Sequence, residues 1–460
     1  MSGDVPKMDR RAFLGGAAAL AATVAQPARA AEPKPLEAAL RGSINASELG
    51  VLPGAFDNQS RTFQRMLEAS SDRDMPVFLP PGLYVVSNLT LPRAVRLTGV
   101  PGATRIVYGG DGHLFLAERT ELLSLENITI DGANRWLGDH TQGLIDARGV
   151  SQLSIDAVRI MGSGKHGVAL DRCAGRMERC EISGAADAGL YSVEGAGLDI
   201  FGNSVSGCGN GGILVHRWQS GDDNTSITGN RIRRIEARAG GTGQNGNGIN
   251  VFRAHGVNVS NNNVADCAFS AIRANSASNL QIISNNCSRS GETAIYAEFA
   301  FEGAVIASNI VDGAANGISI VNFNDGGRMG VCSGNLIRNL VTTGPYPADP
   351  PGFGTGISVE ADATVTGNVI EGAPRAGISI GWGEFMRNVV ANANVIRDAG
   401  VGIAVSVVDG AGPAVITDNL IDKARDGAIV GFKWTDRATG DMALSPSRIE
   451  RLTVERNQIS

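Results

Sequence analysis

The chain has 460 residues, of which 61 are glycine and only 5% are aromatic, and its formal net charge at pH 7 is −6. This mild acidic excess argues against a nucleic-acid-binding protein, because such proteins usually carry a basic excess. The length alone would suggest two or three globular domains. Many glycines and few large rings instead favour a repeat protein built of narrow coils with many turns.

Residues 1–30 are predicted to be a targeting segment. Arg10-Arg11 and Phe13-Leu14 open an apolar run over 15–25, and small residues at 28–30 allow cleavage after Ala30. The segment resembles a bacterial twin-arginine export signal, which implies the twin-arginine translocase as a partner and a periplasmic or secreted location. An ordinary secretory signal or a retained anchor stays open. The run is too short to cross a bilayer, so no membrane span is predicted in the mature form.

Residues 31–57 are predicted to be a linker with a first strand, and residues 58–118 an N-terminal cap with the first coils. A helix is expected over Arg61–Ala69, because three apolar residues fall on one helical face: Phe63, Met66 and Leu67. A turn at 80–84, Pro-Pro-Gly-Leu-Tyr, and alternating apolar residues follow. A helical lid of this kind would cover the open end of a stack of strands.

From 119 to 460 an apolar residue recurs after Gly or Ala, as in Gly-Ile-Ser-Ile at 317–320 and 377–380. These marker residues are Leu144, Val168, Leu190, Ile213, Ile249, Ile272, Ile295, Ile318, Ile357, Ile378, Ile403 and Ile429. Their spacing is 21 to 26 residues, except for two steps of 36 and 39. Such a period indicates stacked repeats, and short alternating segments between Gly, Asn and Asp indicate strands. The sequence therefore predicts an all-β, right-handed parallel β-helix of about a dozen coils with an N-terminal helical cap.

Two further features are interpreted as structural. Asn followed by aliphatic residues precedes most markers, as in Gly-Asn-Leu-Ile at 334–337, and would stack coil on coil as an amide ladder. The six cysteines are scattered singly without a C-x-x-C pair. They are predicted to be small buried hydrophobes, not zinc ligands.

The whole chain resembles the pectin-lyase-like superfamily of right-handed parallel β-helices and, more narrowly, a family of twin-arginine-translocated bacterial repeat proteins. The resemblance rests on Arg10, Arg11, Phe13 and Leu14, on the turn at 80–84 and on the repeats, and it covers nearly all of the chain. The superfamily implies polysaccharide lyases, hydrolases and epimerases as well as non-catalytic adhesins, so the fold does not choose among them. The narrower family implies fold and compartment but no chemistry.

The two long steps point to a candidate site. They place insertions at Arg233–Asn247 and Asn339–Thr355, at the same turn of coils that lie roughly 19 Å apart along the axis. Two loops on one edge would wall a groove for a few sugars. If the markers point inward, the first and third residues after each marker point outward. The two outward rows are Leu214, Asn250, Arg273, Tyr296, Ser319 and His216, Phe252, Asn275, Glu298, Val321.

These rows carry the residue types that sugar-acid chemistry needs. β-Elimination requires a cation on the uronate, a base for the C5 proton and an acid for the leaving oxygen. Arg273 is the candidate cation, and the candidate catalytic set is completed by Tyr296, Glu298 and His216. The candidate substrate-binding residues are Asn250, Phe252, Arg253, Asn275, Arg233 and Arg234. Arginines around the first insertion form a predicted basic patch that would attract a polyanionic glycan, and no metal or other cofactor is predicted.

Two functions stay open. One is an enzyme that acts on an acidic polysaccharide as a lyase, hydrolase or epimerase. The other is a non-catalytic β-helix that binds cell-envelope glycan or serves as a scaffold, with Arg273 and Glu298 as a solvated ion pair of little value. Isolated histidines and tryptophans are interpreted as incidental or as packing: His140, His166, His255, Trp136, Trp382 and Trp434.

Overall fold

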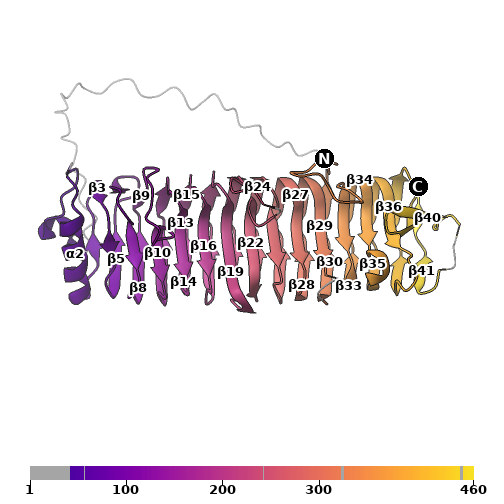
Figure 1. Ribbon diagram of the computed structural model, residues 1–460, viewed down its shortest axis with the longest axis horizontal. Coiled ribbons are helices and arrows are strands. Elements are labelled where there is room, and N and C mark those ends of the chain that lie inside the picture. Colours follow the sequence, from indigo (N-terminus) through magenta and orange to yellow (C-terminus); the bar gives the residue numbers. More distant parts are fainter. Residues whose placement is uncertain (1–41, 56, 242, 323–325, 446–448) are drawn as a thin grey trace, which may run out of the picture. The chain divides into compact units, whose positions relative to one another are not determined.

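The computed structural model describes residues 42–55, 57–241, 243–322, 326–445 and 449–460. Over these residues the chain is an all-β parallel solenoid of about 14 turns, which confirms the predicted β-helix. The coils stack in one row from α2 (Ser60–Asp72) to β41 (Leu452–Glu455), as Figure 1 shows. The predicted signal segment, 1–30, lies outside the described residues. No helix within them is long and apolar enough to cross a membrane.

Each coil contributes three short strands, which pair in parallel with their equivalents in the next coil. After β16 (Ala188–Val193), β17 (Leu198–Phe201) and β18 (Ser204–Ser206) complete one coil, and β19 (Gly211–Asp222) opens the next. Strands equivalent to β17 form a 16-stranded sheet, and the others belong to a 26-stranded sheet. We call the strands that carry the marker residues the marker strands. Besides β16 and β19 they are β10 (Gly143–Arg148), β13 (His166–Asp171), β22 (Asn247–His255), β25 (Ile272–Asn275), β27 (Asn286–Glu298), β29 (Ile310–Val321), β32 (Thr355–Val359), β34 (Val369–Ile380), β36 (Val395–Ser406) and β39 (Ile429–Lys433).

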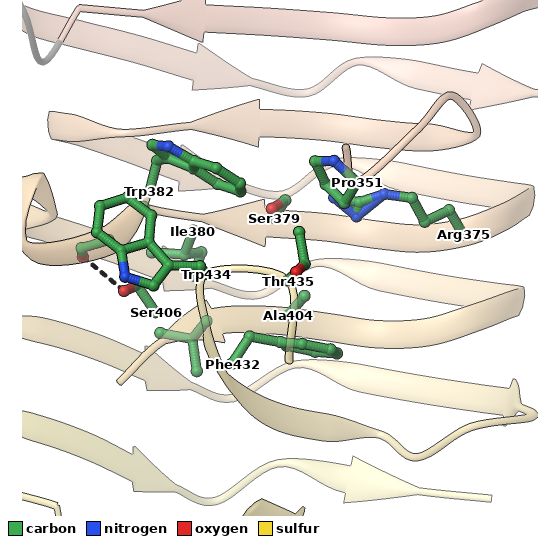
Figure 2. Close-up of a pocket in the computed structure, with 13 residues that line it drawn as sticks. Pro351, Arg375, Ser379, Ile380, Trp382, Ala404, Ser406, Phe432, Trp434 and Thr435 are labelled. Carbon is green, nitrogen blue, oxygen red and sulfur yellow. Dashed lines mark hydrogen bonds between the residues drawn. The ribbon is translucent and has the colours of Figure 1, made fainter. Parts of the chain in front are cut away.

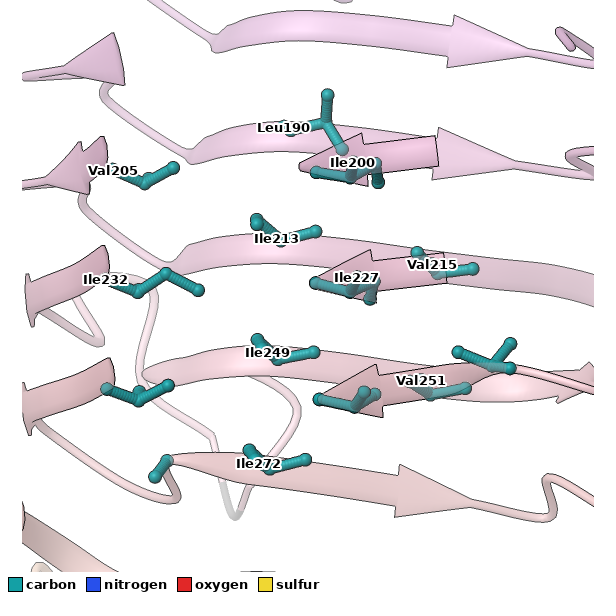
Figure 3. Close-up of a cluster of buried hydrophobic side chains, with 14 of the residues drawn as sticks. Leu190, Ile200, Val205, Ile213, Val215, Ile227, Ile232, Ile249, Val251 and Ile272 are labelled. Carbon is teal, nitrogen blue, oxygen red and sulfur yellow. The ribbon is translucent and has the colours of Figure 1, made fainter. Parts of the chain in front are cut away.

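The marker residues form one inward row, as predicted. Ile249 is in register with Ile272, which is in register with Ile295, and all three are fully buried. Figure 3 shows the same row from Leu190 to Ile272 inside the coils. The first predicted marker was wrong by one position: Ile145, not Leu144, is in register with Val168. Both residues are buried in that coil, so the apolar pattern alone did not separate them.

The recurring asparagines form the predicted ladder at the turn between the second and third strands of each coil. The backbone N–H and Nδ2 of Asn285 donate to Oδ1 of Asn309 at 2.9 and 3.0 Å, and Nδ2 also donates to the Val259 carbonyl at 3.0 Å. The same pattern joins Asn203, Asn230, Asn262, Asn285, Asn309, Asn335, Asn368, Asn394, Asn419 and Asn457. These buried amides satisfy backbone groups that no strand partner reaches.

The N-terminal end of the stack is covered by α2, where the sequence predicts a helix over Arg61–Ala69. Its apolar face is buried as expected and consists of Phe63, Met66 and Leu67. The helix packs on β3 (Gly82–Val86), β4 (Leu89–Thr90) and β5 (Ala94–Thr98). The open end of the first coils is thereby shielded from water.

The cysteines behave as predicted. All six are buried and none is in a disulfide. Burial raises the pKa of the Cys173 thiol to about 11 and that of Cys267 to about 12, so both stay protonated at neutral pH.

Candidate functional site

The outward rows have the predicted register. Asn250 is opposite Arg273 and Arg273 is opposite Tyr296, while Phe252, Asn275 and Glu298 follow one another in the second row. His216 stands opposite Phe252. The candidate residues on β19 to β27 are therefore neighbours on one outward face, because the alternation of a strand places every second side chain on the same side.

The centre of this face is not exposed, which contradicts the expectation that Arg273 faces water. Its side chain is 14% exposed and those of Glu298 and Glu292 are 5% and 2% exposed. Arg273 donates from Nε and Nη2 to the two carboxylate oxygens of Glu298 at 2.7 and 3.0 Å. The Tyr296 ring lies 4.9 Å from the guanidinium carbon. This group of Arg273, Glu292, Tyr296 and Glu298, the buried ion cluster, is a closed network and not a solvated surface pair.

The two insertions cover the buried ion cluster instead of walling an open groove. The first insertion is shorter than the predicted Arg233–Asn247, because residues 233–235 and 247 belong to strands. In its described residues, 236–241 and 243–246, the backbone at Gly243 lies against Arg273, and a Cβ there would be 1.5 Å from Nη1. In the second, residues 339–354, the Tyr346 hydroxyl donates to Oε1 of Glu292 at 2.5 Å. Asn250 binds the first insertion, because its Nδ2 donates to the Gln244 carbonyl at 3.4 Å. Asn275 binds the buried ion cluster, because its Nδ2 donates to Glu298 at 3.0 Å.

A row of aromatic rings continues the same face towards earlier coils, and only its last member, Phe252, follows the first insertion in the sequence. Ring centroids are 4.8 Å apart between His166 and Tyr191, 5.5 Å between Tyr191 and His216, and 5.8 Å between His216 and Phe252. We call these four residues the aromatic row. They come from β13, β16, β19 and β22, whose stacking Figure 1 shows. Tyr191 is opposite Leu214 in the register, so it belongs to the first outward row one coil earlier than predicted.

Asp187 provides a fixed but accessible carboxylate beside this row. The Ala188 N–H donates to Nδ1 of His166 at 3.1 Å, so Nδ1 carries no proton and Nε2 faces Asp187 at 3.5 Å. Asn210 Nδ2 donates to the other carboxylate oxygen of Asp187 at 3.1 Å. The Asp187 side chain nevertheless remains 44% exposed. His166 thus lies next to an accessible carboxylate that Asn210 holds in place.

Burial sets the protonation states of the row. It lowers the pKa of His166, and it lowers the pKa of His216 to about 4, with a smaller contribution from His166. Burial, followed by the charges of Asp171 and Asp187, raises the pKa of the Tyr191 phenol. At neutral pH the row presents neutral imidazoles and a protonated phenol, which is a proton donor. The part of the chain that the structure describes contains no group of three or more His, Cys, Asp or Glu residues that could hold a metal.

A cation stands at each end of the aromatic row. Lys165 Nζ donates to the carbonyls of Gly138 and Thr141 at 2.9 and 2.7 Å. The Arg253 guanidinium lies 4.7 Å from the Phe252 ring centroid and donates to the carbonyl of Trp218 at 2.9 Å. Neither cation pairs with a carboxylate among the described residues. Three coils separate them, roughly 14 Å along the axis.

The predicted basic patch is divided. Arg233 and Arg234 are exposed on β21 (Arg231–Ile235), before the first insertion, whereas Arg253 lies near the far end of β22. The extra residues of the 36-residue step from Ile213 to Ile249 lie in two places. Some form the first insertion, and others form a bulge in β19 between His216 and Gly221, which the repeat period did not predict. This bulge carries Trp218, whose side chain is 63% exposed beside Arg253.

Comparison with known proteins identifies the family. The family model described as "Right handed beta helix region" matches residues 106–232 and 218–386, more than half of the chain. The chain therefore belongs to the right-handed β-helix family.

Solved structures share the fold at low sequence identity. Pre-mature gene product 12 of bacteriophage phi29 is 16% identical with a TM-score of 0.60, over 86% of this chain and 58% of that protein. This chain thus spans somewhat more than half of that protein's length. The A-module of a mannuronan C-5 epimerase from Azotobacter vinelandii is 17% identical with a TM-score of 0.51, over 71% of this chain and 99% of the module. A search of curated proteins found no match.

Proposed function

We propose that the protein binds an acidic polysaccharide along the aromatic row and acts on it by proton transfer at Asp187 and Tyr191. The observation that carries this proposal is a protonated phenol and an oriented, accessible carboxylate on one coil, between two cations without carboxylate partners. A shared β-helix fold with a mannuronan C-5 epimerase is consistent with a substrate of this class.

The arrangement suits β-elimination from a uronate. Lys165 or Arg253 neutralises the sugar carboxylate, which acidifies the C5 proton. Asp187 removes that proton, the bond between C4 and the glycosidic oxygen breaks as the C4–C5 double bond forms, and Tyr191 protonates the leaving oxygen. The exposed indole of Trp218 offers a stacking surface for the next sugar. Withdrawal of the C5 proton is also the first step of epimerisation, so both reactions use the same base.

The residues predicted from sequence take three different roles in this proposal. His216, Phe252 and Arg253 belong to the aromatic row and its rim. Arg273, Tyr296 and Glu298, with Asn250 and Asn275, hold the insertions beside the row, and exposed Arg233 and Arg234 attract the polyanion at longer range.

Turnover on defined polymers tests the proposal. The mature protein is incubated with polygalacturonate, with alginate and with neutral dextran, and the absorbance of unsaturated ends is recorded together with the sugar configuration. We expect change in a polyuronate and none in dextran. Binding of a polyuronate without any product would contradict the catalytic part and would leave a glycan-binding protein.

The proposal includes export to the periplasm or the exterior by the twin-arginine translocase. It is supported by Arg10-Arg11 and the apolar run over 15–25.

A further inference from the structure

A separate pocket lies on the marker strands near the C-terminal end, between β34, β36 and β39. Its side chains include Arg375, Ser379, Trp382, Ser406, Phe432 and Trp434. Figure 2 shows Arg375 on one side, the two indoles on the other, and Ser379 between them. Seven coils separate Ile378 from Leu190, so the pocket is roughly 34 Å from Tyr191 along the axis.

Arg375 is a half-buried cation that lacks a partner. Among the described residues its side chain makes no ion pair or hydrogen bond, and its Nε is fully buried. Burial lowers the pKa of Arg375 to about 10, so the guanidinium is still charged at neutral pH. A buried charge without a counter-charge is costly, and an anion supplied from outside would offset that cost.

The opposite wall of the pocket is aromatic and held in place. Trp382 and Trp434 meet edge to face, with ring centroids 5.5 Å apart at 74°, and Trp434 is 46% exposed. Gly383 has φ of +54°, and a Cβ there would lie 2.2 Å from the Trp434 ring, so only glycine allows this contact. The Ser406 hydroxyl donates to the Gly383 carbonyl at 2.6 Å and fixes the segment, as Figure 2 shows.

The size of the pocket limits what enters it. Its free volume is about 50 Å³, which suits a carboxylate or a few water molecules but not a whole sugar ring. The ring of a bound sugar would stay outside, against the exposed face of Trp434.

We propose that this pocket binds one carboxylate-bearing sugar of an acidic glycan, with the carboxylate on Arg375 and the sugar ring against Trp434. The inference rests on the proposed function only for the class of ligand, because binding here needs no turnover at Tyr191. Arg375 supplies the planar donor pair that matches a carboxylate, and Ser379 offers a hydroxyl between the two walls. A long chain would thus be held at two places on one face.

The test uses binding of tetragalacturonate, measured by calorimetry on the Lys165→Met, Arg253→Met double variant. This background lacks the cations of the aromatic row, so the binding that remains reports on the pocket. We expect Arg375→Met to weaken that binding at least tenfold and Trp434→Ala to weaken it severalfold. The methyl-esterified tetramer, which has no free carboxylates, should bind the background variant as weakly as free tetramer binds the Arg375→Met variant. Arg328→Met, at an exposed arginine on the 16-stranded sheet, is the matched control and should bind normally.

Thermal stability separates a binding role from a structural one. Arg375→Met should melt at the same temperature as its parent or higher, because it removes a partly buried charge that has no counter-charge. Equal tetramer binding with and without Arg375, or equal binding of the methyl-esterified and the free tetramer, would contradict carboxylate binding in the pocket. Neither result would bear on the reaction proposed at Tyr191. Absence of any turnover by the wild type, together with intact, Arg375-dependent binding, would overturn only the proposed reaction.

Discussion

The ionisable side chains of the aromatic row are held in their neutral forms by their surroundings. His166 and His216 are kept unprotonated by burial, and Tyr191 is kept protonated by burial and by two nearby carboxylates. Groups with shifted pKa values that converge on one face are typical of functional sites. The chemistry of the row therefore depends on residues that the coil stack, not the solvent, keeps in one protonation state.

The lowered pKa of His216 predicts an acid-sensitive fold. Because the folded pKa is about 4 and the ordinary value is 6.5, the unfolded chain binds more protons between these values. The stability that the neutral ring provides is complete above pH 6.5 and is lost as pH falls towards 4, by at most about 3 kcal/mol. His216→Phe keeps an aromatic ring that cannot be protonated, so its melting temperature should fall less over this range. Melting curves at several pH values test this, and parallel losses in both proteins would contradict it.

For individual residues, the sequence predicted which side chains share a face but not which of them are exposed to solvent. Alternation from the marker residues placed Arg273, Tyr296 and Glu298 correctly in register. Their burial depends on the path of the two insertions, which no periodicity describes. Tyr191 follows the marker Leu190, so the same rule applied one coil earlier would have found it. Asp187 precedes the strand and carries no such signal.

The two insertions and the buried ion cluster act as one element. Gly243 of the first insertion lies on Arg273, and Tyr346 of the second is hydrogen-bonded to Glu292. Tyr346 also stacks on Phe269, with ring centroids 6.2 Å apart. Both insertions are thus anchored to the same four side chains, which fixes the edge next to the aromatic row.

Removing the arginine from this cluster should destabilise the protein. Arg273→Ala leaves the carboxylates of Glu292 and Glu298 buried without a cation, which costs on the order of 3 kcal/mol. Arg328→Ala, which breaks an exposed pair with Glu302, is the control and should cost less than about 1 kcal/mol. Thermal melts of the two variants measure this difference, and equal melting temperatures would show that the buried ion cluster does not contribute to stability.

At the scale of the whole molecule, the repeat period determined the fold. Each coil buries its apolar residues only against the neighbouring coils, so the same pattern of apolar and turn residues has to recur in every coil. The recurring marker residues predicted the β-helix, and the recurring asparagines predicted the amide ladder. The narrower resemblance to a twin-arginine-translocated repeat family stays a prediction, since its signal lies outside the described residues.

Export is testable on the intact precursor. The paired arginines are the feature that a twin-arginine translocase would recognise, so replacing Arg10 and Arg11 with Lys should leave uncleaved precursor in the cytoplasm. Cell fractionation with an antibody against the mature protein measures this. Unchanged export of the Lys variant would assign the segment to the ordinary secretory route.

The central claim is that chemistry occurs at the aromatic row, beside the accessible carboxylate of Asp187, and not at the buried ion cluster. The most direct measurement compares turnover of two phenol deletions, Tyr191→Phe and Tyr296→Phe, on the polyuronate that the wild type converts. The two tyrosines occupy the same outward position of different coils, so each controls for the other. We predict a loss of about 100-fold or more for Tyr191→Phe, as expected for removal of a general acid, and near-normal turnover for Tyr296→Phe. Normal turnover by Tyr191→Phe would contradict the account.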